Sequence, residues 1–173
     1  MKYHYYYTME YLPTRYQANE SEWDNRHAVW DFKDGYCRNS ILNDMVNIVN
    51  KIACGSKLDY VICFIPASTR RKTTNRFSDV ARKLIERTGI EATLSAIEKP
   101  FDSDSGYIGG KSDNPTEGFN FNASLFKGKN VILIDDVITR GRTFFDAAEK
   151  LRSHGAISVT GLFVAKTVNP DFC

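Results

Sequence analysis

The 173-residue sequence lacks any apolar run long enough to cross a membrane. Its longest, Tyr60–Ile65, is far short of the ~20 residues that a spanning helix needs. The amino-terminal residues are aromatic and polar, without the apolar stretch and small-residue cleavage site of a signal peptide. We therefore expect a soluble, cytoplasmic protein with no membrane partner.

The sequence also lacks the cysteine spacing of a metal site or a disulfide framework. Its four cysteines are scattered, with no Cys-x-x-Cys pair and no histidine at ligand spacing. Cys63 lies inside an apolar run and Cys54 ends an amphipathic pattern, so both are predicted to be small buried side chains. Reduced thiols fit the cytoplasm.

A large excess of one charge is missing as well. The 23 Lys and Arg against 21 Asp and Glu leave a formal net charge of +2, whereas a dedicated nucleic-acid binder usually shows a clear basic excess. We therefore expect no nucleic-acid partner. The small excess is local: Arg70, Arg71, Lys72 and Arg76 form a basic cluster directly after an apolar run.

Apolar periodicity predicts alternating strands and helices after an irregular amino-terminal region. Residues 1–39 show no sustained period, apart from a short strand at Tyr3–Met9. The expected helices run from a cap at Ser40 to Ile52, from Phe77 to Ile85 with an end at Gly89, and from Phe144 to Leu151. The expected strands are Tyr60–Ile65, Ala92–Ile97, Val131–Ile134 and Val159–Ala165.

This alternation predicts an α/β fold: a Rossmann-like, mostly parallel sheet with helices on both faces. We expect a single domain over residues 1–173, with an amino-terminal hood and helical segment at 1–55 and a core at 56–166. Residues 99–130 are rich in Gly, Asp, Ser and Pro and have no period. A loop of that length is usually a functional lid or an insert, and both alternatives are open.

The most informative segment is Val131–Thr143, with the sequence VILIDDVITRGRT. Four apolar residues lead into Asp135 and Asp136, then into a loop with Gly141, and then into a helix. In an α/β sheet this order places carboxylates where ligands bind and backbone amides where phosphate binds. The carboxylates repel phosphate, so they are predicted to meet hydroxyl donors or a Mg²⁺-bound sugar. A sugar phosphate fits both ends, and an acidic helix cap is the alternative.

This segment resembles the phosphoribosyl-pyrophosphate (PRPP) motif of type I phosphoribosyltransferases, which is an apolar strand, two acidic residues and a Thr-Gly-x-Thr-like loop. The resemblance implies that Asp135 and Asp136 are the catalytic pair and hold the ribose hydroxyls. It also implies a 5′-phosphate loop made of Thr139, Arg140, Gly141, Arg142 and Thr143. Arg140 replaces the commoner Thr or Ser, as it does in amidophosphoribosyltransferases.

The resemblance extends less strongly over residues 60–165. Residues 65–66, 70–72, 75–77 and 122–126 are similar to ComF-type competence-associated phosphoribosyltransferases, to which the resemblance is closest. That family has a pyrophosphate-binding loop after its first core strand. The resemblance implies this role for Ala67, Ser68, Thr69, Arg70 and Arg71, with Lys72 or Arg76 as further cations. A solvated basic patch is the alternative.

The activity that the resemblance implies is a Mg²⁺-dependent transfer of 5-phosphoribose from PRPP to a nitrogen nucleophile, a base or an amine, with release of pyrophosphate. Mg²⁺ is expected to be held mainly through PRPP, with Asp135 and Asp136 as further ligands, and the lid to exclude water. A non-catalytic PRPP sensor, and more remotely a Mg²⁺-dependent phosphatase or nucleotide hydrolase, are the rivals. The amino-terminal aromatic side chains are predicted either to stack on a flat acceptor or to pack as core or as a homodimer face; they are Tyr5, Tyr6, Tyr7, Tyr16, Trp23, Trp30 and Tyr36.

Overall fold

The computed structural model describes residues 3–100 and 113–170. Its helices are α1 (Glu20–Lys33), α2 (Asn39–Ile52), α3 (Arg70–Thr88) and α4 (Arg142–Ser153). Its strands are β1 (Tyr5–Tyr11), β2 (Tyr60–Phe64), β3 (Glu91–Thr93), β4 (Ile97–Glu98), β5 (Asn120–Phe121), β6 (Asn130–Ile138) and β7 (Ser158–Thr167). Short 3-10 turns occupy Lys57–Asp59 and Ala123–Leu125.

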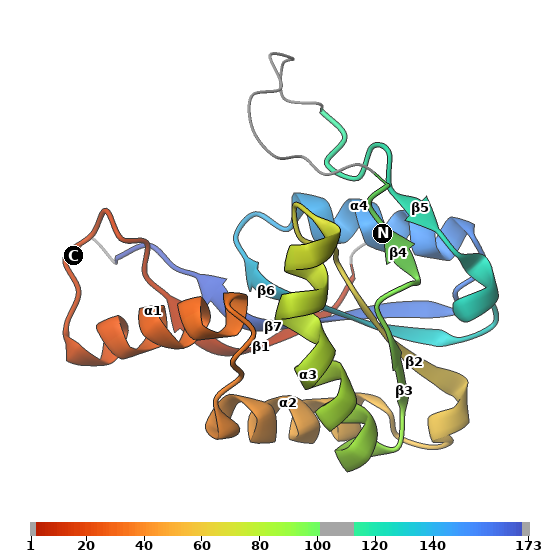
Figure 1. Cartoon of the computed structure of the whole chain (residues 1–173), viewed down its shortest axis with the longest axis horizontal. Coiled ribbons are helices and arrows are strands. Elements are labelled where there is room, and N and C mark those ends of the chain that lie inside the picture. The colour runs from red at the N-terminus through yellow and green to blue at the C-terminus, as the bar shows by residue number, and fades with distance from the viewer. Residues whose placement is uncertain (1–2, 101–112, 171–173) are drawn as a thin grey trace.

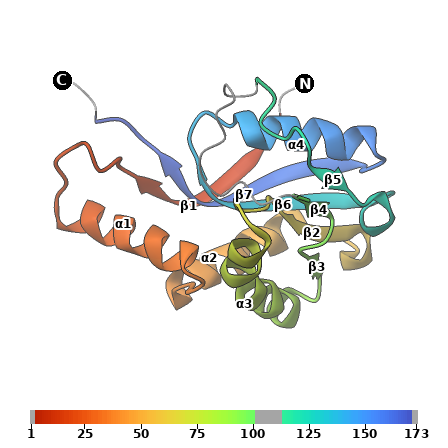
Figure 2. The same ribbon diagram turned by 45° about the horizontal axis from the view of Figure 1, so that its top comes forward.

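Five strands form one sheet in the order β1-β7-β6-β2-β3, and all neighbouring strands are parallel. A parallel sheet has to be covered on both faces, and this one is: α1, α2 and α3 lie on one face and α4 on the other (Figures 1 and 2). The strands β4 and β5 form a separate antiparallel pair on the α4 side. The α/β fold expected from the sequence is confirmed.

Strand alternation divides the core into two clusters. Ile132 and Ile134 of β6 pack toward α1, α2 and α3, while Val131 and Leu133 pack toward α4. Successive residues of a strand point to opposite faces, so Asp135 and Asp136, which follow directly, also lie on opposite faces. Beyond them the alternation changes, because Val137 packs on the α1–α3 side and Ile138 on the α4 side.

The amino-terminal third differs most from the sequence-based expectation. Residues 20–33 form α1, where an irregular segment was expected, whereas the short strand expected at Tyr3–Met9 is present as β1, an edge strand of the main sheet. The helix α2 begins at Asn39 after an N-cap at Arg38, so the expected Ser40 cap is wrong. Its apolar face, with Met45 and Val49 fully buried, is as expected.

Regular structure is also present inside residues 99–130. The strand β5 pairs with β4, and Phe126 and Thr116 are fully buried. The expectation of one long loop is therefore too broad for residues 113–130, because their aromatic side chains pack against the core. Residues 101–112 lie outside the described part, and the lid hypothesis for them stays a prediction.

Two smaller findings complete the fold. Cys54 is exposed, contrary to expectation, whereas Cys63 is fully buried. Within the described ranges, no helix combines the length and apolar composition that a membrane span requires.

Candidate functional site

The two segments singled out in the sequence meet at the carboxyl edge of the sheet. In the sheet, β2 has β3, the next strand of the main sheet in the chain, on one side and β6 on the other side. The order of the strands therefore reverses between β2 and β6, and ligands of open α/β sheets bind at such a switch point. Residues 66–70 follow β2, and Asp135 and Asp136 lie near the end of β6. The structure therefore brings both predicted site segments to one place.

The strand β6 is longer than the sequence suggested. It continues past Ile134 to Ile138 through its register with β7, which pairs Asp135 with Phe163 and Ile138 with Lys166. The neighbouring strand β2 ends at Phe64. The two aspartates consequently belong to a strand, not to the loop after it, and the strand fixes the directions of their side chains.

A cavity of about 320 Å³ lies beside this end of β6. Its lining consists of Ile65, Asp135, Phe163 and residues 137–144. All five residues of the predicted phosphate loop are therefore part of one wall. The cavity volume is within the range of small-molecule sites.

The loop into α4 leaves its first amides open to a ligand. Gly141 is the N-cap of α4, has a φ of 78°, and provides no capping side chain. A Cβ at this position would lie 2.7 Å from Cε2 of Phe145, so only glycine fits. Amides at a helix N-terminus attract anions, and the exposed Arg140 and Arg142 flank them.

The two aspartates have different surroundings. Asp135 faces the cavity, and its Oδ1 accepts a hydrogen bond from the Asp136 amide at 2.8 Å. Burial, followed by the negative charge of Asp136, raises the pKa of the Asp135 carboxyl well above its usual range. Asp136 forms ion pairs with Lys33 of α1, at 3.5 Å, and Arg76 of α3, at 3.3 Å. Sequence reasoning assigned no role to Lys33.

The segment between β2 and α3 is held by its own hydrogen bonds. The Thr69 hydroxyl caps α3 by accepting from the Lys72 amide at 3.0 Å. Thr73 accepts from the Ala67 amide at 2.9 Å and donates to the Thr69 carbonyl at 2.8 Å. The Ala67 amide and the Thr69 hydroxyl are thus engaged inside the segment, and their assignment to a diphosphate stays a prediction, as does that of Ser68.

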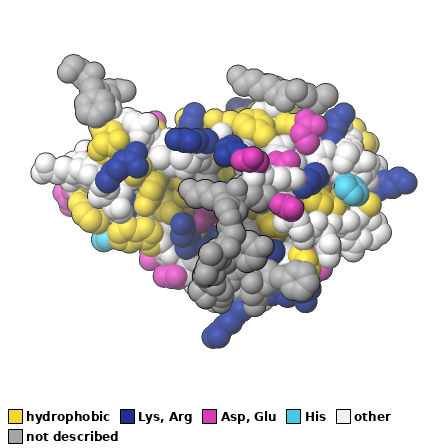
Figure 3. All heavy atoms as spheres, turned by 90° about the horizontal axis from the view of Figure 1, so that it is seen from above, with side chains coloured by type: hydrophobic (Ala, Val, Ile, Leu, Met, Phe, Trp, Pro, Cys, Tyr) yellow, Lys and Arg dark blue, Asp and Glu magenta, His cyan; other side chains and the backbone are white. Residues whose placement is uncertain are grey.

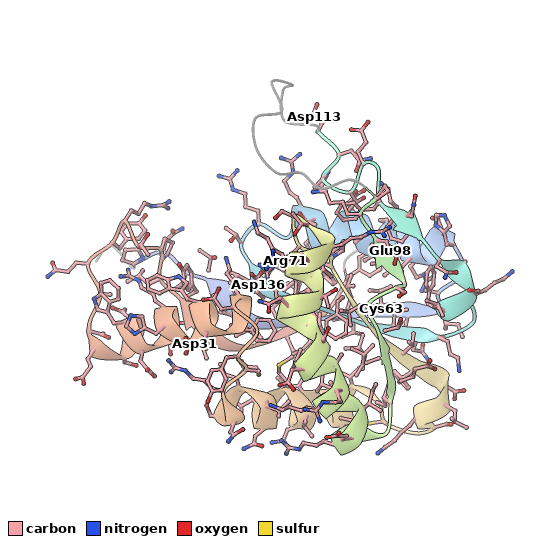
Figure 4. The ribbon with its side chains drawn as sticks, viewed as in Figure 1. Asp31, Cys63, Arg71, Glu98, Asp113 and Asp136 are labelled. Atoms are coloured by element: carbon pink, nitrogen blue, oxygen red, sulfur yellow. The ribbon has the colours of Figure 1, made fainter. Side chains whose placement is uncertain are left out.

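Two arginines of that segment extend outward. Arg70 and Arg71 are exposed in the first turn of α3, and Figure 4 shows Arg71 at this end of α3 with Asp136 nearby on β6. The N-terminus of α3 adds its positive dipole end at the same place. From above, basic and acidic side chains are interspersed around the face that includes α4 (Figure 3). On this face the basic side chains therefore do not form a continuous stripe.

Comparison with known proteins gives a partial match. No family model matches the chain. The chain is 42% identical to the ribose-phosphate pyrophosphokinase of Saccharolobus solfataricus over 82 aligned residues. The aligned stretch covers 47% of this chain and 25% of that relative. The chain therefore matches about a quarter of the curated relative's length.

Two of the solved structures with a similar arrangement are phosphoribosyltransferases. A hypoxanthine phosphoribosyltransferase from Staphylococcus aureus has 14% identity and a TM-score of 0.48, over 84% of this chain and 77% of that one. The adenine phosphoribosyltransferase from Saccharomyces cerevisiae has 19% identity and a TM-score of 0.45, over 75% of this chain and 70% of that one.

Proposed function

We propose that the protein binds PRPP and transfers its 5-phosphoribosyl group to a nitrogen nucleophile, with release of pyrophosphate. The observation that carries this proposal is the cavity in which an open helix N-terminus and one carboxylate, Asp135, face the same space. The similarity to a ribose-phosphate pyrophosphokinase supports a phosphorylated ribose as the ligand.

The 5′-phosphate is assigned to the loop before α4. The first amides of α4 donate to its oxygens, and the Arg140 and Arg142 side chains add positive charge. The Thr139 hydroxyl is 2.8 Å from the Thr167 hydroxyl of β7, which fixes its position at the rim. Thr143 lines the same cavity and supplies a further donor.

The ribose is assigned to Asp135, whose carboxylate accepts hydrogen bonds from sugar hydroxyls. Magnesium fits this place, since Mg²⁺ is typically held by one or two carboxylates together with phosphate oxygens of the substrate. The described residues contain no group of three His, Cys, Asp or Glu side chains suited to a metal, so we assign the protein's share to Asp135. When bound, Mg²⁺ supplies positive charge to the diphosphate.

The diphosphate is assigned to Arg70 and Arg71 at the N-terminus of α3. As the bond between C1 and the diphosphate oxygen breaks, negative charge gathers on the leaving group. Cations and a helix dipole fixed beforehand at that point stabilise the charge. The acceptor nitrogen then forms its bond to C1 and releases a proton to water.

A second reaction uses the same ribose site. The name of the curated relative describes the transfer of a diphosphate to a ribose phosphate. In that case ribose 5-phosphate occupies the same cavity, and a nucleoside triphosphate supplies the diphosphate. Both reactions need the Asp135 and α4 contacts, so ligand binding tests the site and product analysis tests the reaction.

The test of the site is a thermal shift with PRPP and Mg²⁺. Ligand at ~100 times its dissociation constant adds roughly 2.7 kcal/mol, and each kcal/mol shifts melting by about 2–4 °C at this size, so we expect a rise of roughly 5–10 °C. Arg142→Ala is expected to reduce this rise in melting temperature. The control is Arg82→Ala, because Arg82 is exposed on α3 about three turns beyond Arg70 and Arg71, and we expect this variant to keep the full rise. No rise at millimolar PRPP contradicts the proposal.

The test of the reaction is a product screen. PRPP is incubated with purine and pyrimidine bases, amines and ammonia, and pyrophosphate release is measured. In parallel, ribose 5-phosphate is incubated with a nucleoside triphosphate, and PRPP formation is measured. Binding without either product identifies a PRPP sensor.

A further inference from the structure

The carboxylate of Asp136 is fully used by the protein itself. Its Oδ2 lies 3.5 Å from Nζ of Lys33 and 3.3 Å from Nη1 of Arg76. Its Oδ1 accepts a hydrogen bond from the Val137 amide at 2.6 Å. Asp136 is only 8% exposed, so these contacts leave little of the carboxylate to a ligand.

Strand geometry directs the two aspartates to opposite faces of the sheet. Asp135 continues the row of Val131 and Leu133, on the α4 side, and lines the cavity. Asp136 continues the row of Ile132 and Ile134, on the side of α1 and α3. The lining of the cavity includes the first aspartate but not the second.

The groups around Asp136 form a close junction of three elements. The end of α1 is docked on α3, because the Asn75 side chain donates to the Asp34 carbonyl at 3.1 Å. Gly35, with a φ of 95°, approaches so closely that a Cβ there would lie 2.4 Å from the Asn75 carbonyl oxygen. Lys33 and Arg76 are the neighbours of these contacts in sequence, and Asp136 joins them to the end of β6.

Charge makes Asp136 central to this junction. In the described part of the chain, Nε of Arg76 is buried without a hydrogen-bond partner, so its guanidinium depends on the nearby carboxylate. Removing one partner of a desolvated pair leaves the other charge uncompensated, which is strongly destabilising. Neutralising Asp136 therefore weakens the attachment of both α1 and α3 to β6.

We propose that Asp136 is a positioning residue that fixes the C-terminal end of α1 to the site through Lys33 and Arg76. Lys33 thereby becomes part of the machinery of the site, and Asp135 remains as the carboxylate that contacts the ribose. This last clause alone rests on the proposed function. The two acids of the PRPP-like motif thus have different roles: Asp135 contacts the ligand, and Asp136 holds the surrounding helices in place.

Hydrogen exchange of the ligand-free full chain tests the anchor. Asp136→Asn keeps the Oδ1 acceptor for Val137 but loses the charge, and we expect amides of α1 to exchange on the order of tenfold faster. Lys33→Met is expected to speed the exchange of α1 amides only roughly threefold, because the Lys33 side chain is 45% exposed and its charge is partly screened by water. Lys33→Arg restores the wild-type rate, and amides of α4 are unchanged in every variant.

Two controls make the result specific. Lys83→Met removes a comparable ion pair, to Asp79 on α3, and leaves exchange in α1 unchanged. The double variant of Lys33→Met and Asp136→Asn is no faster than Asp136→Asn alone, because both remove one coupling. Asp135→Asn weakens PRPP binding at least tenfold while α1 exchanges at the wild-type rate.

The contrary results are equally definite. Unchanged exchange of α1 in Asp136→Asn, together with loss of PRPP binding, makes Asp136 a ribose ligand and overturns the proposal. If Asp136→Asn fails to fold, the exposed Lys33→Met still decides, and a wild-type rate of α1 exchange in that variant overturns the anchor. A wild-type protein that binds no PRPP refutes the proposed function but leaves the exchange result standing.

Discussion

Replacing Gly141 by alanine is the most direct test of the phosphate loop. The residue is buried, has a φ of 78° and caps α4. An added Cβ lies 2.7 Å from Cε2 and 3.0 Å from Cδ2 of Phe145. The half-buried Phe145 ring packs against neighbouring rings, with Phe144 at 5.3 Å and Tyr3 at 6.4 Å between centroids, so a shift of the ring disturbs these contacts.

The expected cost has two parts. The left-handed backbone costs an L-residue roughly 1–2 kcal/mol, and the crowding against Phe145 adds about 1–3 kcal/mol. Together they lower the free energy of unfolding by roughly 2–5 kcal/mol, which corresponds to a fall in the melting temperature of roughly 4–20 °C. The displaced loop also weakens PRPP binding, because the α4 amides no longer point into the cavity.

A matched control separates the two parts. Gly118 also has a φ of 78°, but no atom lies within 4 Å of an added Cβ. In Gly118→Ala, the free energy of unfolding is therefore lowered only by the left-handed backbone. The difference between the melting temperatures of the two variants then gives the contribution of the contact with Phe145. If Gly141→Ala melts at the same temperature as Gly118→Ala and binds PRPP normally, the reasoning about the loop is refuted.

Three further outcomes are expected. Arg71→Ala lowers the turnover of PRPP more than it raises the Michaelis constant, because charge on the diphosphate grows only in the transition state; an equal kcat with a raised KM contradicts this. Arg26→Ala lowers the free energy of unfolding by about 3 kcal/mol or more in urea titrations, since the buried guanidinium donates three hydrogen bonds to backbone carbonyls of residues 12–16. In a Cys173→Ser background at pH 8, a thiol reagent labels Cys54 rapidly but not Cys63, because burial raises the pKa of the Cys63 thiol to about 12; fast labelling of Cys63 means that the core opens.

The core of the fold is predictable from the sequence because its signals are strong and local. Central strands of a parallel sheet are apolar throughout, as in Val131–Ile134, and α3 has a regular apolar face. The helix α1 was missed because its buried face includes Arg26 and the small Ala28, which weaken the apolar period. A signal was nevertheless present: Asn19 and Glu22 form a capping box.

The sequence located the segments that line the cavity, but it could not give their geometry. The order of apolar strand, acids and glycine loop singled out Asp135 and residues 139–143, which line the cavity, whereas their roles toward a ligand stay predictions. The sequence could not show that Asp136 turns away from the cavity, because this depends on β6 continuing as a strand beside β7. The role that we propose for Lys33 depends on its ion pair with Asp136, far away in the chain, for which no local pattern exists.

The pairing of β1 with β7 sets the order in which the chain folds during synthesis. Thr8 and Val164, whose hydrogen bond joins the two strands, are 156 residues apart. At a translation rate of about 5–20 residues per second, β1 is synthesised roughly 8–30 s before its partner strand. Until β1 is paired in the sheet, α1, which packs against β1 and β6, also lacks a complete sheet face to pack on. The proposed ligand site, to which Lys33 of α1 is joined through Asp136, is therefore completed only when the last strand of the sheet has been made.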